Sequence, residues 1–141
     1  MISGACAISP ATATPTTASR LQRTLEDACQ IAKLCEEYRG KDTVVLDLTQ
    51  VTPIMDFFVV TTGTSARQMH ALCDEARVQM KARSRKPPAT EGYEQSSWIL
   101  QDWGDIVLHT FLPEAREQYD LEGLWADAKR VDWRAVLAKS E

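Results

Sequence analysis

The chain has 141 residues, 44% of them hydrophobic and 26% charged, and this composition excludes wholesale disorder, a coiled coil and a collagen-like chain. The length fits a single domain that is able to bury a sizeable core. No apolar run approaches the ~18–20 residues that a membrane-spanning helix needs, so the sequence predicts no membrane segment.

The net charge of −4 is unevenly distributed along the chain. Between Glu91 and Asp127, nine acidic side chains are opposed only by Arg116, so this stretch carries −8 and the remainder +4. An acidic surface repels phosphate backbones and attracts basic partners, although a solvated acidic face without a partner would have the same composition. The nine acids are Glu91, Glu94, Asp102, Asp105, Glu114, Glu117, Asp120, Glu122 and Asp127.

The first nineteen residues carry no charged side chain and are rich in Ala, Thr, Ser and Pro. They lack the basic start and apolar middle of a secretory signal, and they match an organellar transit peptide weakly because Arg first appears at Arg20. We expect residues 1–19 to be a disordered tail or an over-extended start, in a cytoplasmic protein, with organellar targeting left open. Four scattered cysteines without a CxxC pair favour a reducing compartment.

Hydrophobic spacing in the first half of the chain predicts two helices and two strands. Apolar residues recur at helical spacing over Ser19–Arg39, and the β-branched run Thr43–Thr49 is typical of a strand. Asp56–Thr62 is almost continuously apolar and therefore favours a central strand. A second amphipathic helix follows from Ser65 and ends near Ala82 in a basic run.

The second half predicts a hairpin and short helices. Strand-like runs at Ser97–Trp103 and Asp105–Leu112 flank Gly104, which is typical of a tight turn. Pro113 opens a short helix, and Val131–Leu137 has the pattern of a last one. The order of elements predicts a single α+β domain with a mixed sheet and helices packed on it. We place this domain at residues 20–127, followed by a C-terminal extension at 128–141 with a short helix.

The turn Gly63-Thr64-Ser65 lies between a predicted strand and a helix, where free backbone N–H groups often bind phosphate. A metal-dependent nucleotidyltransferase would combine this turn with Asp47 and Asp105, but Asp105 has no second acid two residues along its strand. The turn also lacks a P-loop lysine. We therefore expect a structural turn and helix cap formed by Gly63, Thr64, Ser65 and Gln68, with no metal and no cofactor.

Two further kinds of site are weaker alternatives. His70 and Cys73 are spaced for one helix face, but two ligands do not make a metal site. The basic run Lys81–Lys86 suits RNA, but cations also belong at a helix C-terminus for structural reasons. We expect no sequence-specific nucleic-acid binding.

An ordered set of motifs from Leu21 to Trp125 resembles the ribosomal silencing factor family, also called iojap-like. Each motif is weak by itself, whereas the set in this order is specific. The motifs are Asp47 in VVLDL, Asp56 before FFVVTTGTSARQ, Glu91-Gly92 followed by Trp98, the run Asp102–His109 (DWGDIVLH), and Arg116, Tyr119, Leu121-Glu122 and Leu124-Trp125.

The resemblance implies a nucleotidyltransferase-like α+β fold without that activity, and thus a protein that is not an enzyme. It implies binding to the large ribosomal subunit, through its protein fourteen, on the face that meets the small subunit. Occupation of that face would block subunit joining and repress translation when nutrients are limiting. Several family members form homodimers, so a homodimer is expected as well.

The residues suggest where such docking would occur. Aromatic side chains rimmed by acids are typical of interface hot spots, and ribosomal proteins are mostly basic. We predict Trp98 as the apolar anchor, with acids that set association rate and orientation. The predicted partner-binding residues are Trp98, Asp102, Asp105, His109, Arg116, Tyr119 and Glu122.

Overall fold

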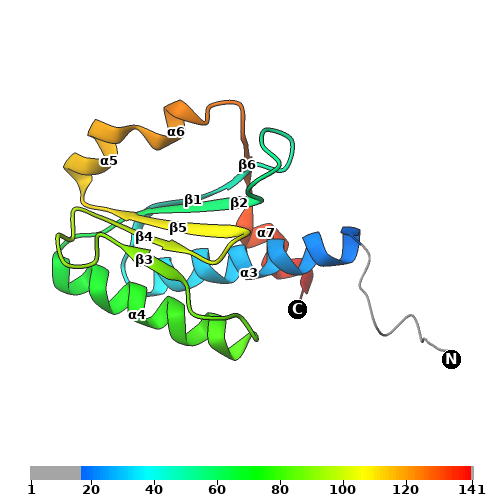
Figure 1. Cartoon of the computed structure of the whole chain (residues 1–141), viewed down its shortest axis with the longest axis horizontal. Coiled ribbons are helices and arrows are strands. Elements are labelled where there is room, and N and C mark those ends of the chain that lie inside the picture. Colours follow the sequence, from blue (N-terminus) through cyan, green and yellow to red (C-terminus); the bar gives the residue numbers. More distant parts are fainter. Residues whose placement is uncertain (1–16, 141) are drawn as a thin grey trace, which may run out of the picture.

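The computed structural model describes residues 17–140, in which a six-stranded mixed sheet is flanked by helices on both faces (Figure 1). The strand order is β3-β4-β5-β2-β1-β6. β2 and β5 run parallel and are buried along their whole length, whereas every other neighbouring pair is antiparallel. The strands are β1 (Lys41–Asp47), β2 (Phe57–Thr62), β3 (Ala89–Glu91), β4 (Trp98–Asp102), β5 (Ile106–Phe111) and β6 (Lys129–Val131).

Two long helices close one face of the sheet (Figure 1). α3 (Thr17–Glu37) and α4 (Ala66–Ala82) lie against it, and α7 (Trp133–Ser140) packs on α3. Ala28, Ile31, Ala32 and Cys35 repeat at helical spacing along α3, and all four are fully buried. Each fully buried large aliphatic side chain here contributes about 2 kcal/mol to stability.

The opposite face is covered at one end by α5 (Pro113–Tyr119) and α6 (Leu121–Leu124), which lie above the sheet in Figure 1. Side chains alternate between the two faces along each strand, so the residues next in sequence to those of the first core point to this opposite face. Phe58, Val60 and Phe111 form a smaller core here with Leu121, and several members at its margin are only partly buried. The second face is therefore less completely closed than the first.

The predicted α+β domain with a mixed sheet is confirmed. The hairpin turns at Gly104, whose φ of +99° suits glycine, and the central position of β2 is as expected. The observed last helix begins two residues after the predicted start at Val131. The short edge strands β3 and β6 were absent from the prediction, since three residues carry no readable alternation.

The predicted tail at residues 1–19 lies mostly outside the described residues, and helix α3 already begins at Thr17. Cys29, Cys35 and Cys73 are free and buried, as their place in apolar patterns indicates. Burial raises the pKa of the Cys29 and Cys73 thiols to about 12, so these two are unreactive. Within residues 17–140, no helix is long and apolar enough to cross a membrane.

Candidate docking surface and its support

A cluster of aromatic rings lies on the second face of the sheet, where β4 and β5 meet the end of α5. Trp98 and Phe111 are direct partners across the two antiparallel strands, and their ring centroids are 4.9 Å apart. Tyr119, the last residue of α5, lies 4.8 Å from Trp98 by the same measure. The aromatic cluster consists of Phe58, Trp98, His109, Phe111, Tyr119 and Trp125.

His109 lies at the base of the aromatic cluster and is only 3% exposed. Trp98 Nε1 donates a hydrogen bond of 3.1 Å to His109 Nδ1, which requires a neutral ring with its proton on Nε2. Burial lowers the pKa of His109 to about 4, because the charged imidazolium would lose its hydration. His109 therefore orients Trp98 from below and is uncharged near neutral pH.

Arg116 fixes the covering helices to the sheet. Its Nε donates to Glu122 Oε1 at 2.9 Å, and a second guanidinium nitrogen donates to Thr62 Oγ1 at 2.8 Å. Glu122 also accepts from Arg130 at 3.1 Å. The hydrogen bond from Arg116 is the main cause that holds the pKa of Glu122 below its ordinary value, against the effect of burial. Between the two helices the chain reverses at Asp120, which has a left-handed φ of 44°.

The outer side of the aromatic cluster faces solvent. Tyr119 is 51% exposed and Leu124, on α6, is 74% exposed, while Trp98 is half-buried beside Tyr119. Exposed carboxylates lie on the same covering segment, at Glu114, Glu117 and Asp120. An aromatic surface with an acidic rim has the composition of a protein-binding site for a basic partner.

The predicted partner-binding residues fall into two groups in the structure. Trp98, His109, Tyr119, Arg116 and Glu122 lie together, as described above. Asp102 and Asp105 lie at the opposite end of β4 and β5, four residues from Trp98 and from His109 respectively, which is about 13 Å at a rise of roughly 3.3 Å per residue. There, Asp102 Oδ1 accepts a hydrogen bond of 2.7 Å from the Gly104 N–H, which shapes the hairpin turn.

Asp105 belongs to an ion-pair network under the helices. Arg85 donates to it at 2.6 Å, and the Thr24 hydroxyl donates to its other oxygen at 3.1 Å. Burial by itself would raise the pKa of the Asp105 carboxyl, but the Arg85 hydrogen bonds and charge outweigh it and hold the pKa below its ordinary value. The position of Asp105 thus indicates a structural role, away from the aromatic cluster.

The Gly63-Thr64-Ser65 turn acts as the predicted helix cap. Ser65 Oγ accepts a hydrogen bond of 3.1 Å from the Gln68 N–H, and Gln68 Oε1 accepts one of 2.9 Å from the Thr64 N–H. A Cβ at Gly63 would collide with the side chain of Met69, so the turn packs tightly on its own helix. The cap thereby occupies two backbone N–H groups, those of Thr64 and Gln68, that a bound phosphate would need as donors.

The parts of the nucleotidyltransferase alternative are not brought together. The turn follows the end of β2, whereas Asp47 and Asp105 lie beside the start of that strand, roughly 20 Å away along it. Asp47 accepts from both the backbone and the hydroxyl of Thr49. Within residues 17–140, no three His, Cys, Asp or Glu side chains are grouped so that they could hold a metal ion.

Comparison with known proteins decides the family. A family model described as "ribosomal silencing factor during starvation" matches residues 21–141. The chain belongs to the ribosomal silencing factor family. The match continues past Trp125 to the end of the chain, so the β6–α7 extension lies within the family's matched region.

Relatives and solved structures agree with this assignment. Proteins named ribosomal silencing factor are 38% identical over 104 residues in Chromobacterium violaceum (71% of this chain, 85% of that one) and 33% identical over 101 residues in Bacillus subtilis (72% and 86%). A mouse protein named "Mitochondrial assembly of ribosomal large subunit protein 1" is 32% identical over 79% of this chain, which covers 50% of the mouse protein.

Two crystal structures have the same fold. One, of a Chromobacterium violaceum protein, has a TM-score of 0.68 at 35% identity and covers 72% of this chain and 86% of its own. The other, from Bacillus halodurans, has a TM-score of 0.65 at 30% identity and covers 79% and 98%. Maize has a relative named "Protein Iojap, chloroplastic", 30% identical over 77% of this chain, which covers 47% of the maize protein.

Phe58 and Phe111 are members of the aromatic cluster that the sequence reasoning missed. Both lie in strands that were predicted correctly, and Phe111 is two residues from His109, so strand alternation already puts these two on one face. The sequence pattern does not indicate how β4 and β5 pair, and it is this register that sets Trp98 opposite Phe111.

Proposed function

We propose that this protein binds the large ribosomal subunit through its protein fourteen, at the face that meets the small subunit, and thereby blocks subunit joining and represses translation under nutrient limitation. Membership of the ribosomal silencing factor family supports the ribosome as the target. The names of the bacterial and mouse relatives also support the ribosome as the target.

The observation that carries the proposal is the half-open aromatic cluster with its acidic rim. Trp98 and Tyr119 offer flat apolar area, and Tyr119 and Leu124 are exposed enough to be covered by a partner. Exposed Glu114 and Glu117 are suited to steer a basic ribosomal protein toward this area. Beneath the aromatic cluster, His109 holds the Trp98 ring in position through a hydrogen bond. The ion pair of Arg116 with Glu122 holds α5 in position.

Asp102 and Asp105 take no part in this proposed contact, because they lie at the other end of the sheet. A homodimer is compatible with the same proposal, since the remaining surface of the domain is left free by the docking.

Sedimentation with purified ribosomal subunits tests the function. The protein is expected to migrate with the large subunit alone, and to lower the yield of joined ribosomes when both subunits are mixed with magnesium. Migration with the small subunit, or an unchanged yield of joined ribosomes at saturating protein, would contradict the proposal. Bovine serum albumin in the same gradient controls for nonspecific migration.

The nucleotidyltransferase alternative has a direct test of its own. We expect no heat of binding in calorimetry when ATP or GTP is added with magnesium, because the Gly63 turn and the aspartates are far apart. Clear binding or turnover would favour an enzyme instead.

A further inference from the structure

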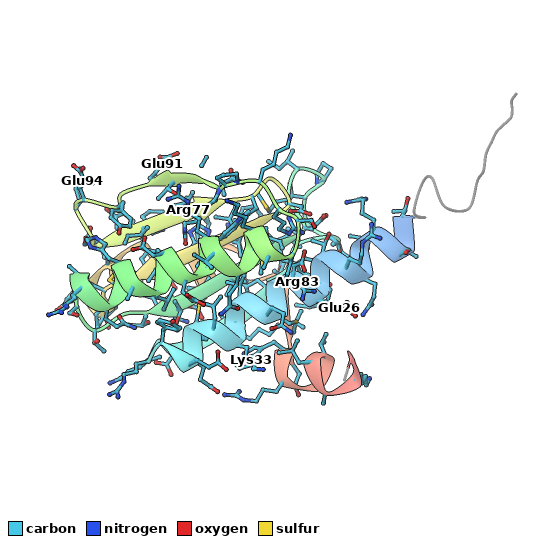
Figure 2. The ribbon with its side chains drawn as sticks, turned by 90° about the horizontal axis from the view of Figure 1, so that it is seen from below. Glu26, Lys33, Arg77, Arg83, Glu91 and Glu94 are labelled. Carbon is cyan, nitrogen blue, oxygen red and sulfur yellow. The ribbon has the colours of Figure 1, made fainter. Side chains whose placement is uncertain are left out.

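The loop of residues 92–97 joins β3 to β4 and lies at the same end of the sheet as α5 (Figure 1). Its last residue directly precedes Trp98, with which β4 begins. Figure 2 shows Glu94 of this loop pointing outward, away from α4. Other groups of the loop are turned inward and contact α4, so this helix bears on the chain just before Trp98.

His70 of α4 holds the loop through one backbone carbonyl. Its Nε2 lies 2.7 Å from the carbonyl oxygen of Tyr93 and donates to it, since a carbonyl oxygen can only accept. The Ser96 hydroxyl donates to the same oxygen at 2.8 Å and lies 2.8 Å from His70 Nε2. Ser96 is only 4% exposed, so these hydrogen bonds form where water competes little.

The side chain of Tyr93 is held by the same helix. Its ring stacks on the His70 imidazole, with 4.1 Å between the ring centroids and 8° between the ring planes. Its hydroxyl donates to the Asp74 carboxylate at 3.1 Å, one helical turn beyond His70. α4 therefore fixes both the backbone and the side chain of the loop. The His70 clasp consists of His70, Asp74, Tyr93 and Ser96.

Trp98 lies beyond the reach of β3. The pairing of β3 with β4 extends only as far as Leu100. At Trp98, one edge of β4 pairs with Phe111 of β5, and Gly92 of the loop lies against the Trp98 carbonyl. A Cβ at Gly92 would collide with that carbonyl oxygen, and its φ of +77° also suits glycine, so the loop packs closely on the Trp98 backbone. The backbone of Trp98 is thus held by β5 and by the loop.

We propose that His70 is a positioning residue for Trp98. The His70 clasp fixes the loop from the α4 side of the sheet, and the loop holds the start of β4, from which the Trp98 side chain projects into the aromatic cluster on the opposite face. His70 acts on docking without contact to the partner. That a partner meets Trp98 rests on the proposed function, whereas the effect of His70 on the orientation of Trp98 does not.

The indole N–H signal of Trp98 in a two-dimensional proton–nitrogen NMR spectrum of the full chain tests the inference. This N–H donates to His109 Nδ1 at 3.1 Å, so its chemical shift reports the orientation of the ring. The variant Trp98→Phe assigns the signal. We expect His70→Ala to shift or broaden it. The affinity for purified large ribosomal subunits should fall roughly tenfold, because a Trp98 that is no longer held must be ordered on binding.

Two variants separate positioning from a general loss of stability. His70→Gln should restore both readouts, because its side-chain amide can donate to the Tyr93 carbonyl in place of the imidazole. Leu34→Ala, at a fully buried position on α3, should destabilise the chain and still keep the wild-type indole signal and affinity. Should His70→Ala fail to fold, Ser96→Ala removes one hydrogen bond to the same carbonyl and carries the test with a smaller expected shift.

An indole signal in folded His70→Ala that matches the wild type would overturn the inference. Equal changes in His70→Ala and Leu34→Ala, or no recovery in His70→Gln, would overturn it as well. If the signal moves in His70→Ala while the affinity stays, the positioning holds and docking through the aromatic cluster fails. If the wild type does not bind large subunits at all, the proposed function fails, and the indole signal still decides the role of His70.

Discussion

The two faces of the sheet differ in how completely they are closed. The face under α3 and α4 buries Ile31, Leu34 and Leu72 fully, and α7 seals it further. The opposite face has a smaller core, and its cover ends at Tyr119 and Leu124, which remain half or more exposed. Both faces use aromatic or aliphatic side chains, so composition does not distinguish them.

Under the proposed function, this difference assigns stability and recognition to different sides of one sheet. On the closed face, a substitution outside the His70 clasp should cost folding energy and leave the ribosome contact untouched. On the open face, the exposed residues should matter for binding more than for folding, and only the polar supports beneath them should affect both. Substitutions on the two faces can break that separation, and the largest loss of stability is expected on the closed face.

Leu34→Ala on the closed face is expected to lower the free energy of unfolding by about 3 kcal/mol, because it leaves a cavity in a fully buried site. Urea denaturation measures the loss. At a temperature where the variant is still folded, it should sediment with the large subunit as the wild type does. A loss below ~1 kcal/mol would show that this face is less tightly packed than described.

His109 predicts an acid-dependent loss of stability on the open face. Its pKa is about 4 when folded, against an ordinary value near 6.5, so the unfolded chain takes up the proton first as the pH falls. The contribution of His109 to the free energy of unfolding is complete above pH 6.5. It declines by about 3 kcal/mol as the pH falls from 6.5 to 4.

Urea midpoints between pH 7 and pH 4 measure this decline. His109→Gln keeps a hydrogen-bond acceptor for Trp98 and should flatten the dependence in that window, whereas His70→Gln, at the other histidine of the chain, should retain it. The same slope in His109→Gln as in the wild type would rule out this histidine as the cause.

The sequence predicted the closed face well and the open face only in part. Leu72, Cys73, Ala76 and Met80 were identified from helical spacing and are all buried. Asp105 was assigned to the docking surface as one of the acids in the stretch that carries Trp98, but it lies just before β5, at the other end of that strand from Phe111 and next to Arg85. The pairing of Trp98 with His109 depends on strand register, which local pattern does not encode.

Arg116→Gln tests the support of the open face. It removes an ion pair with Glu122 and a hydrogen bond to the buried Thr62 hydroxyl, and is expected to cost about 1–2 kcal/mol of folding stability. Because α5 would then be held less firmly, large-subunit binding should weaken too. Arg134→Gln, whose partner Glu36 is an exposed residue, is the control and should change stability by less than ~0.5 kcal/mol.

Leu124→Ala should have the smallest effect on stability, within about 0.5 kcal/mol, since the side chain is 74% exposed. Thermal melts measure it. A loss above ~1 kcal/mol would mean that Leu124 belongs to the folded core and is not free for a partner.

The affinity of Tyr119→Ala for purified large ribosomal subunits tests the central claim most directly. The matched control is Val78→Ala on α4, another exposed apolar residue (61%) but on the closed side of the sheet. With both variants folded, we expect Tyr119→Ala to lose about 2 kcal/mol of binding free energy, roughly thirtyfold in affinity, and Val78→Ala to bind as the wild type does. Wild-type affinity in Tyr119→Ala, or an equal loss in Val78→Ala, would contradict the account.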